Sequence, residues 1–283
     1  MSRVVCIHGI AQELESRDSL LAEWVPSLCG GISNAGGQLD PTDVDMAFYG
    51  ILFRPPGSKG AMGGAIEIPN YKPRDLDNPL EIALAEEIYA AVALTPGGSG
   101  TKAKAGERTV GHMLEAIAAT PFFGNVAQRV VIWFLKQVRL YLTEPETRRA
   151  AQKSLIDRVG AETRVIVAHS LGSVVAYETL CAHPEFPVRT LITLGSPLGT
   201  PALLPRFVPP VRPGNAPWPT GLERWVNVAD AADIVALCKQ LRPLYGERVL
   251  DQVVHNGATM HNVLPYLTAP QTGRAILEGL RGN

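Results

Sequence analysis

Short runs of aliphatic and β-branched residues, separated by helical patterns, limit the folds open to this chain more than any other feature. The runs span residues 3–7, 43–53, 164–168, 189–194, 224–228 and 248–254. Near-continuous apolar runs of this length are typical of strands that are buried on both faces. Helical spacing of apolar residues is found at 19–29, 78–94, 109–142, 143–159 and in the C-terminal segment. The alternation predicts an α/β fold with a mostly parallel central sheet and helices on both faces.

The chain of 283 residues is predicted to form a single domain over 1–283. Residues 54–143 would be a helical insertion, or cap, between the early strands and the strand at 164–168. Pro26 is expected to kink or end the helix at 19–29, because proline cannot donate the helical hydrogen bond.

Composition and charge exclude several classes of partner. The net charge is −1 and charged residues make up 19% of the chain, so nucleic acid is not an expected partner. The most apolar later segment, 130–142, carries Lys136 and Arg139 and is too short to cross a bilayer, which predicts no integral membrane span. No export signal is apparent at the start, so we expect a cytoplasmic protein. The cysteines and histidines lack metal-ligand spacing, and we expect no metal and no cofactor.

Residues 164–172 predict a strand, a sharp turn at Ser170 and a helix. A serine hydroxyl needs a neighbouring base and a projecting backbone position before it can attack a carbonyl carbon. A strand–turn–helix elbow provides that projection and requires small neighbouring residues. Ala168 stands where the Gly-x-Ser-x-Gly motif has its first glycine, and Gly172 fills the second position. We therefore expect Ser170 to be a nucleophile; the alternative is a serine in an ordinary strand–helix loop.

Two backbone amides are candidates for an oxyanion hole. Leu171 would begin the helix after the elbow, where free N–H groups favour negative charge. The loop after the first strand would supply the second amide, since Gly9 permits a close backbone approach. We expect that amide to be Ile10, with Ala11 as second choice, and His8 to brace the loop through a hydrogen bond. The alternative is that His8 and Gly9 only turn the chain.

Two aspartates follow the strand at 224–228 and are candidates for the acid of a triad. We favour Asp233 over Asp230, because the apolar segment 234–237 would turn back into the structure and hold its carboxylate. The other aspartate would then cap a helix or form a turn.

Two histidines follow the aspartates, and the base of a triad comes last in this order of residues. His255 ends the apolar run at 253–254 and would be a strand-end residue. His261 lies in a loop before a helix, from which a side chain can reach the serine. The sequence therefore predicts a triad of Ser170, Asp233 and His261.

These motifs resemble those of lipase-type α/β-hydrolases. The resemblance rests on the segments 8–10, 168–173 and 194–197. The segment 233–235 is similar to the acid segment of class 3 lipases, and His261 with Tyr266 and Leu267 is similar to their histidine segment. The start of the chain also resembles bacterial hydrolases that begin with a His-Gly-Ile strand. The resemblance implies an α/β-hydrolase fold and supports Asp233 and His261; the long stretch between Phe53 and Glu144 departs from the pattern.

The triad and the resemblance predict a serine hydrolase that cleaves carboxylic esters through an acyl-enzyme, on a small-molecule acyl substrate with an apolar group. An acyltransferase, a thioesterase or a peptidase would use the same triad, and a noncatalytic binding protein would share the scaffold. Residues 112–142 would form core alone, or core together with a pocket or lid. The proline-rich loop at 201–219 would be a further pocket wall or a surface loop.

Overall fold

The centre of the molecule is a parallel sheet. A computed structural model describes residues 2–55, 68–94, 109–120, 123 and 126–281. Its six strands lie in the order β2–β1–β3–β4–β5–β6, and every neighbouring pair is parallel. They are β1 (Val4–Ile7), β2 (Val44–Ala47), β3 (Val165–His169), β4 (Thr190–Leu194), β5 (Arg224–Asp230) and β6 (Val249–Val254). The expected α/β fold with a mostly parallel sheet is confirmed.

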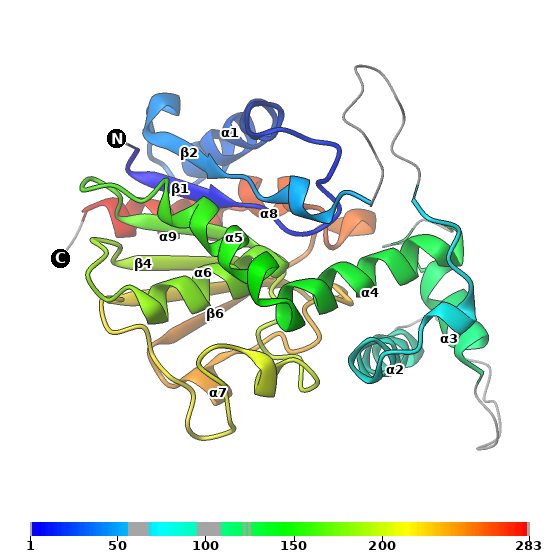
Figure 1. Cartoon of the computed structure of the whole chain (residues 1–283). Coiled ribbons are helices and arrows are strands. Elements are labelled where there is room, and N and C mark those ends of the chain that lie inside the picture. Colours follow the sequence, from blue (N-terminus) through cyan, green and yellow to red (C-terminus); the bar gives the residue numbers. More distant parts are fainter. Residues whose placement is uncertain (1, 56–67, 95–108, 121–122, 124–125, 282–283) are drawn as a thin grey trace.

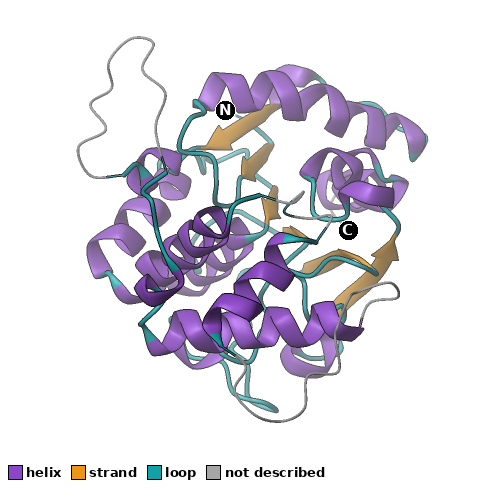
Figure 2. Cartoon of the chain, turned by 90° about the vertical axis from the view of Figure 1, so that its right-hand side faces the viewer, coloured by secondary structure: helices purple, strands orange, loops and turns teal. Residues whose placement is uncertain are grey.

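Helices cover both faces of this sheet (Figures 1 and 2). One face carries α1 (Arg17–Asn34), α8 (Val263–Thr268) and α9 (Pro270–Arg281); the other carries α5 (Pro145–Ile156) and α6 (Leu171–Ala182). Alternate residues of each strand enter the two cores. In β1, Val4 and Cys6 pack toward α1, whereas Val5 and Ile7 pack toward α6, and all four are fully buried. Burial on both faces explains why the strands read as continuous apolar runs.

Within 54–143, the range predicted to be a helical insertion, the described residues form α2 (Pro79–Leu94), α3 (Val110–Ala118) and α4 (Gln128–Thr143), which precede α5 and β3 in the chain. In Figure 1, α4 runs from the sheet toward α2 and α3, which lie beyond the carboxyl ends of the strands. The buried Glu81 of α2 forms salt bridges with Lys136 at 3.2 Å and Arg139 at 2.7 Å, which joins α2 to α4. Residues 56–67, 95–108, 121–122 and 124–125 lie outside the described residues.

Pro26 was expected to kink or end the first helix, but the helix does not end there. Pro26 lies inside α1, which continues to Asn34. Leu28 and Ile32, beyond the proline, are fully buried against the sheet. Their packing compensates for the missing hydrogen bond, because tertiary burial contributes more to helix stability than local propensity.

The second strand is shorter than the run at 43–53 suggested. It ends at Ala47, and Gly50–Phe53 forms a 3-10 helix. The Tyr49 amide donates to His8 Nε2 at 3.0 Å, and its hydroxyl donates to the His8 carbonyl at 2.7 Å. These bonds draw the chain toward the loop after β1.

The short α7 (Arg242–Tyr245) links β5 to β6. Within the described ranges, the helices all fall short of the length and hydropathy that crossing a bilayer requires.

Candidate active site

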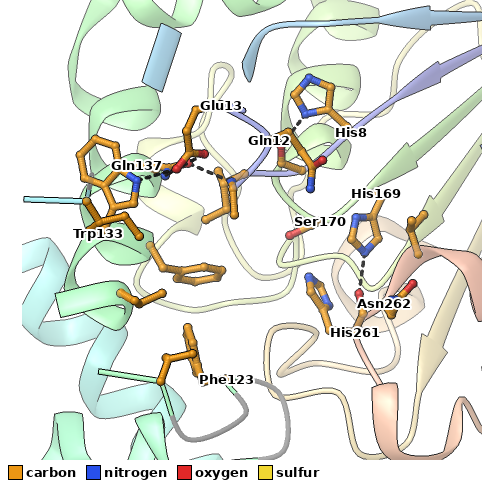
Figure 3. A pocket seen from close by; sticks show the side chains of 18 of the residues that line it. His8, Gln12, Glu13, Phe123, Trp133, Gln137, His169, Ser170, His261 and Asn262 are labelled. Atoms are coloured by element: carbon orange, nitrogen blue, oxygen red, sulfur yellow. Dashed lines mark hydrogen bonds between the residues drawn. The ribbon is translucent and has the colours of Figure 1, made fainter. Parts of the chain in front are cut away.

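The candidate site lies at the carboxyl ends of β1 and β3, where the sheet order reverses. The chain passes from β1 to β2 on one side and, after the insertion, to β3 on the other side. In open α/β sheets this crevice is the usual place for a ligand. The loop after β1 and the turn after β3 meet there and line a cleft of about 390 Å³, to which Ser170, His169 and His261 also contribute (Figure 3).

Ser170 occupies a strained turn between β3 and α6. Its backbone has φ +51° and ψ −129°, a region that residues with a side chain rarely adopt. The Ser170 amide donates to the Leu194 carbonyl at 3.0 Å, which ties the turn to β4. A Cβ atom at Gly9 would lie 2.7 Å from Ser170 Cβ, and one at Gly172 would lie 2.3 Å from the His8 carbonyl oxygen. Both glycines therefore permit the close approach of the two loops.

Asp233 and His261 form a buried pair beside the serine. The His261 Nδ1 and Asp233 Oδ2 atoms are 2.6 Å apart. Tyr266 donates its hydroxyl to the same carboxylate oxygen at 2.8 Å. The other oxygen accepts the amides of Val235 at 2.8 Å and Ala236 at 3.3 Å. The segment after Asp233 thus holds its carboxylate as the sequence suggested.

The protonation of this pair suits a proton acceptor at the serine. Burial by itself raises the pKa of Asp233, but the neighbouring His261 and the hydrogen bonds from Val235 and Tyr266 lower it to about 2. Asp233 is therefore ionised near neutral pH and accepts the Nδ1 proton of His261. Nε2 is then the ring atom that can take a proton. Figure 3 shows the His261 ring beside the Ser170 side chain, at the edge of the cleft.

The disfavoured candidates occupy other positions. Asp230 uses one carboxylate oxygen to accept the Ala232 amide at 2.7 Å and the other to accept the Asn256 amide. It therefore closes a turn, the role expected of the second aspartate. His255 is exposed at the end of β6, and it is not among the described residues that line the cleft.

Two further histidines near the serine are neutral. The Nε2 atom of His8 accepts the Tyr49 amide, so Nδ1 carries the proton and donates to the Gly9 carbonyl at 2.6 Å. Burial lowers the pKa of His8 to about 4. Burial, and then the neighbouring His261, lower the pKa of His169 to about 3. His8 braces the loop as expected, while His169 Nε2 lies 3.0 Å from the His261 carbonyl and supports the loop that carries that ring.

The loop after β1 favours Ile10 over Ala11 as an oxyanion donor. The Ala11 amide donates to Gln137 Oε1 at 3.0 Å, and Ala11 has φ +61°. Within the described parts of the chain, neither the Ile10 amide nor the Leu171 amide donates a hydrogen bond to another residue. Both residues line one small pocket together with Ser170.

Side chains of the insertion hold this loop, a feature that sequence reasoning missed. Gln137 of α4 is fully buried and accepts the Ala11 amide. Glu13, at the end of the loop, accepts the Trp133 indole N–H at 2.8 Å (Figure 3). The one available signal was a glutamine within the apolar run at 130–142. Tyr266 was also missed as a partner of Asp233; a buried tyrosine hydroxyl generally requires such a partner.

Comparisons with known proteins do not assign the chain to a family. No protein-family model and no curated protein matches the chain. A relationship to lipase-type α/β-hydrolases, which the motifs imply, therefore stays a prediction. In the parts of the chain that the structure covers, no cluster of three or more His, Cys, Asp or Glu side chains is arranged to hold a metal ion.

Proposed function

We propose that this protein is a serine hydrolase of the α/β-hydrolase type that cleaves carboxylic esters. The observation that carries the proposal is the strained turn at Ser170 together with the buried Asp233–His261 pair, with Ser170 and His261 lining one cleft. Backbone strain in a residue with a side chain is maintained only where the surrounding structure enforces it, and such strain is frequent at active sites.

The proposed acylation step assigns a role to each of these groups. The Ser170 hydroxyl attacks the ester carbonyl carbon while His261 Nε2 accepts its proton. The Asp233 carboxylate stabilises the resulting imidazolium through Nδ1–H. The amides of Ile10 and Leu171 stabilise the oxyanion, for which one donor is worth about 2.7–4 kcal/mol of barrier. His261 then protonates the leaving oxygen, and an acyl-enzyme and a free alcohol result.

Deacylation repeats the same proton transfers with water as nucleophile. His261 accepts a proton from the water, the hydroxide attacks the acyl carbon, and the proton returns to Ser170 Oγ as the carboxylic acid leaves. Apolar side chains around the serine supply the binding surface for the substrate. They include Phe134 and Val138 of α4 and Leu171 of α6.

Ser170→Ala tests the proposal directly. The wild-type protein should be labelled on Ser170 by a fluorophosphonate probe and should hydrolyse p-nitrophenyl esters. The variant should lose both reactions while its thermal unfolding stays close to that of the wild type. His255→Ala is the matched control and should keep its activity, because His255 is exposed and outside the cleft. Ester hydrolysis that survives in Ser170→Ala would remove this serine from the mechanism.

A further inference from the structure

Ser170 stands between two spaces of very different size. One is the cleft of about 390 Å³ that His261 also lines. The other is a pocket of about 20 Å³ with almost wholly apolar walls. Ile10 and Phe134 line both spaces, so the two meet at the serine.

The small pocket holds a very short chain. A pocket that holds one water-sized group has a volume of roughly 10–15 Å³. This pocket therefore accommodates about one or two such groups, which is the size of a methyl or ethyl substituent. Leu84 and Ile88 of α2 and Val138 of α4 form part of its wall, and each of the three is at most 5% exposed. Close-packed side chains of this kind do not move aside without cost.

The position of His261 decides which half of an ester enters which space. His261 must protonate the leaving oxygen, so the alcohol part has to lie beside its ring. Of the two spaces, the described residues place His261 only on the wide cleft. The acyl substituent lies on another bond of the tetrahedral carbon and points away from His261. Ile10 and Leu171, the proposed oxyanion donors, line the small pocket and would hold the substrate carbonyl at its mouth.

We infer that the substrates are esters of very short carboxylic acids, acetates and propionates, with a bulky and mainly apolar alcohol. The wide cleft suits such an alcohol, because Phe123, Val126, Val130 and Trp133 line it. Hydrolysis consumes one water and releases the short acid and the alcohol. The inference rests on the proposed function, since it assigns the two halves of the substrate from the roles of Ser170 and His261.

Two isomeric esters test the orientation. Hexyl acetate and methyl heptanoate have the same atoms and differ in which side of the ester carries the long chain. Hydrolysis of each by the purified protein is followed by titration of the released acid, with Ser170→Ala as background. One methylene that a pocket cannot accept costs about tenfold or more in kcat/KM, so hexyl acetate should be the better substrate by at least about tenfold.

Variants of the small pocket test its role as the acyl site. In a series of p-nitrophenyl esters from acetate to octanoate, the wild type should prefer acetate or propionate. Ile88→Ala and, independently, Leu84→Ala enlarge the pocket and should move the optimum to longer acyl chains, raising the hexanoate-to-acetate ratio of kcat/KM by about tenfold or more. Val130→Ala is the matched control. Val130 lines the wide cleft and not the small pocket, so the dependence of kcat/KM on acyl length should not change, whatever the effect on the overall rate.

The outcomes separate this inference from the proposed function. If methyl heptanoate is the better isomer, or if both α2 variants keep the wild-type profile, the acyl assignment is wrong while the hydrolase survives. If no ester is hydrolysed and no probe labels Ser170, both proposals are wrong. Preference for hexyl acetate together with a shifted profile in either α2 variant supports the assignment.

Discussion

Replacing Asp233 by asparagine should inactivate the protein through the tautomer of His261. The two carboxylate oxygens of Asp233 have different partners: one accepts backbone amides from Val235 and Ala236, and the other accepts His261 Nδ1–H and the Tyr266 hydroxyl. An asparagine has a single oxygen. That oxygen has to face the two backbone amides, because an NH₂ group there would meet two donors.

The NH₂ group of the asparagine would then face His261 Nδ1 and donate to it. The ring proton moves to Nε2, and Nε2 can no longer accept the proton of Ser170. The same substitution in a serine-protease triad lowers kcat by about ten-thousandfold, or about 5 kcal/mol of barrier at about 1.36 kcal/mol for each factor of ten. We expect a loss of this size for Asp233→Asn.

The assay is kcat for a p-nitrophenyl ester, with thermal unfolding to show that the variant is folded. Asp230→Asn is the matched control: both oxygens of Asp230 accept backbone amides in a turn, so the variant should lose stability and keep most of its kcat. A folded Asp233→Asn protein with kcat within about a hundredfold of wild type would refute the tautomer argument. A larger loss in Asp230→Asn than in Asp233→Asn would transfer the acid role to Asp230.

Two further predictions concern the loop after β1 and the behaviour in acid. Gln137→Met removes the acceptor of the Ala11 amide, so the loop should relax and kcat should fall by up to about a hundredfold with little change in KM; Gln152→Met, on α5, is the control, and equal kcat values in the two variants would contradict the role of Gln137. The pKa of Asp233 is about 2 in the folded protein against an ordinary value of 3.8. Its charged form therefore contributes about 2 kcal/mol of stability above about pH 4, and this contribution is lost as the pH falls toward about 2. Urea unfolding of wild type and Asp233→Asn should show a stability difference that shrinks over that window; a constant difference would assign the stability to other contacts.

The strands and the elbow were predictable because their signals are local. Burial on both faces of the sheet leaves continuous apolar runs, and five of the six runs match strands closely. The turn at Ser170 lies within nine residues that read as strand, small residue, serine and helix. Predictions from local sequence were wrong where tertiary contacts opposed the local preference. Pro26 is accommodated within α1 because the residues beyond it are buried, and the run at 43–53 leaves the sheet early because Tyr49 bonds to His8.

The order Ser170, Asp233, His261 along the chain suggested a triad, but sequence order cannot state distances. The sequence favoured Asp233, but only the folded chain shows Asp233 Oδ2 2.6 Å from His261 Nδ1. Asp230, three residues earlier, closes a turn instead. Both aspartates follow the same strand, so their roles depend on which backbone amides and side chains surround each carboxylate.

The sequence by itself determined the class of fold and singled out Ser170 as the candidate nucleophile, since both follow from patterns a few residues long. The tertiary structure alone decided what surrounds Ser170. Gln137 reaches Ala11 across 126 residues, and α2 and α4 close the small pocket on one side of the serine. Contacts over such separations depend on how the helices pack above the sheet. Hydrophobic periodicity indicates which face of a helix is buried, but it does not indicate which element packs against that face.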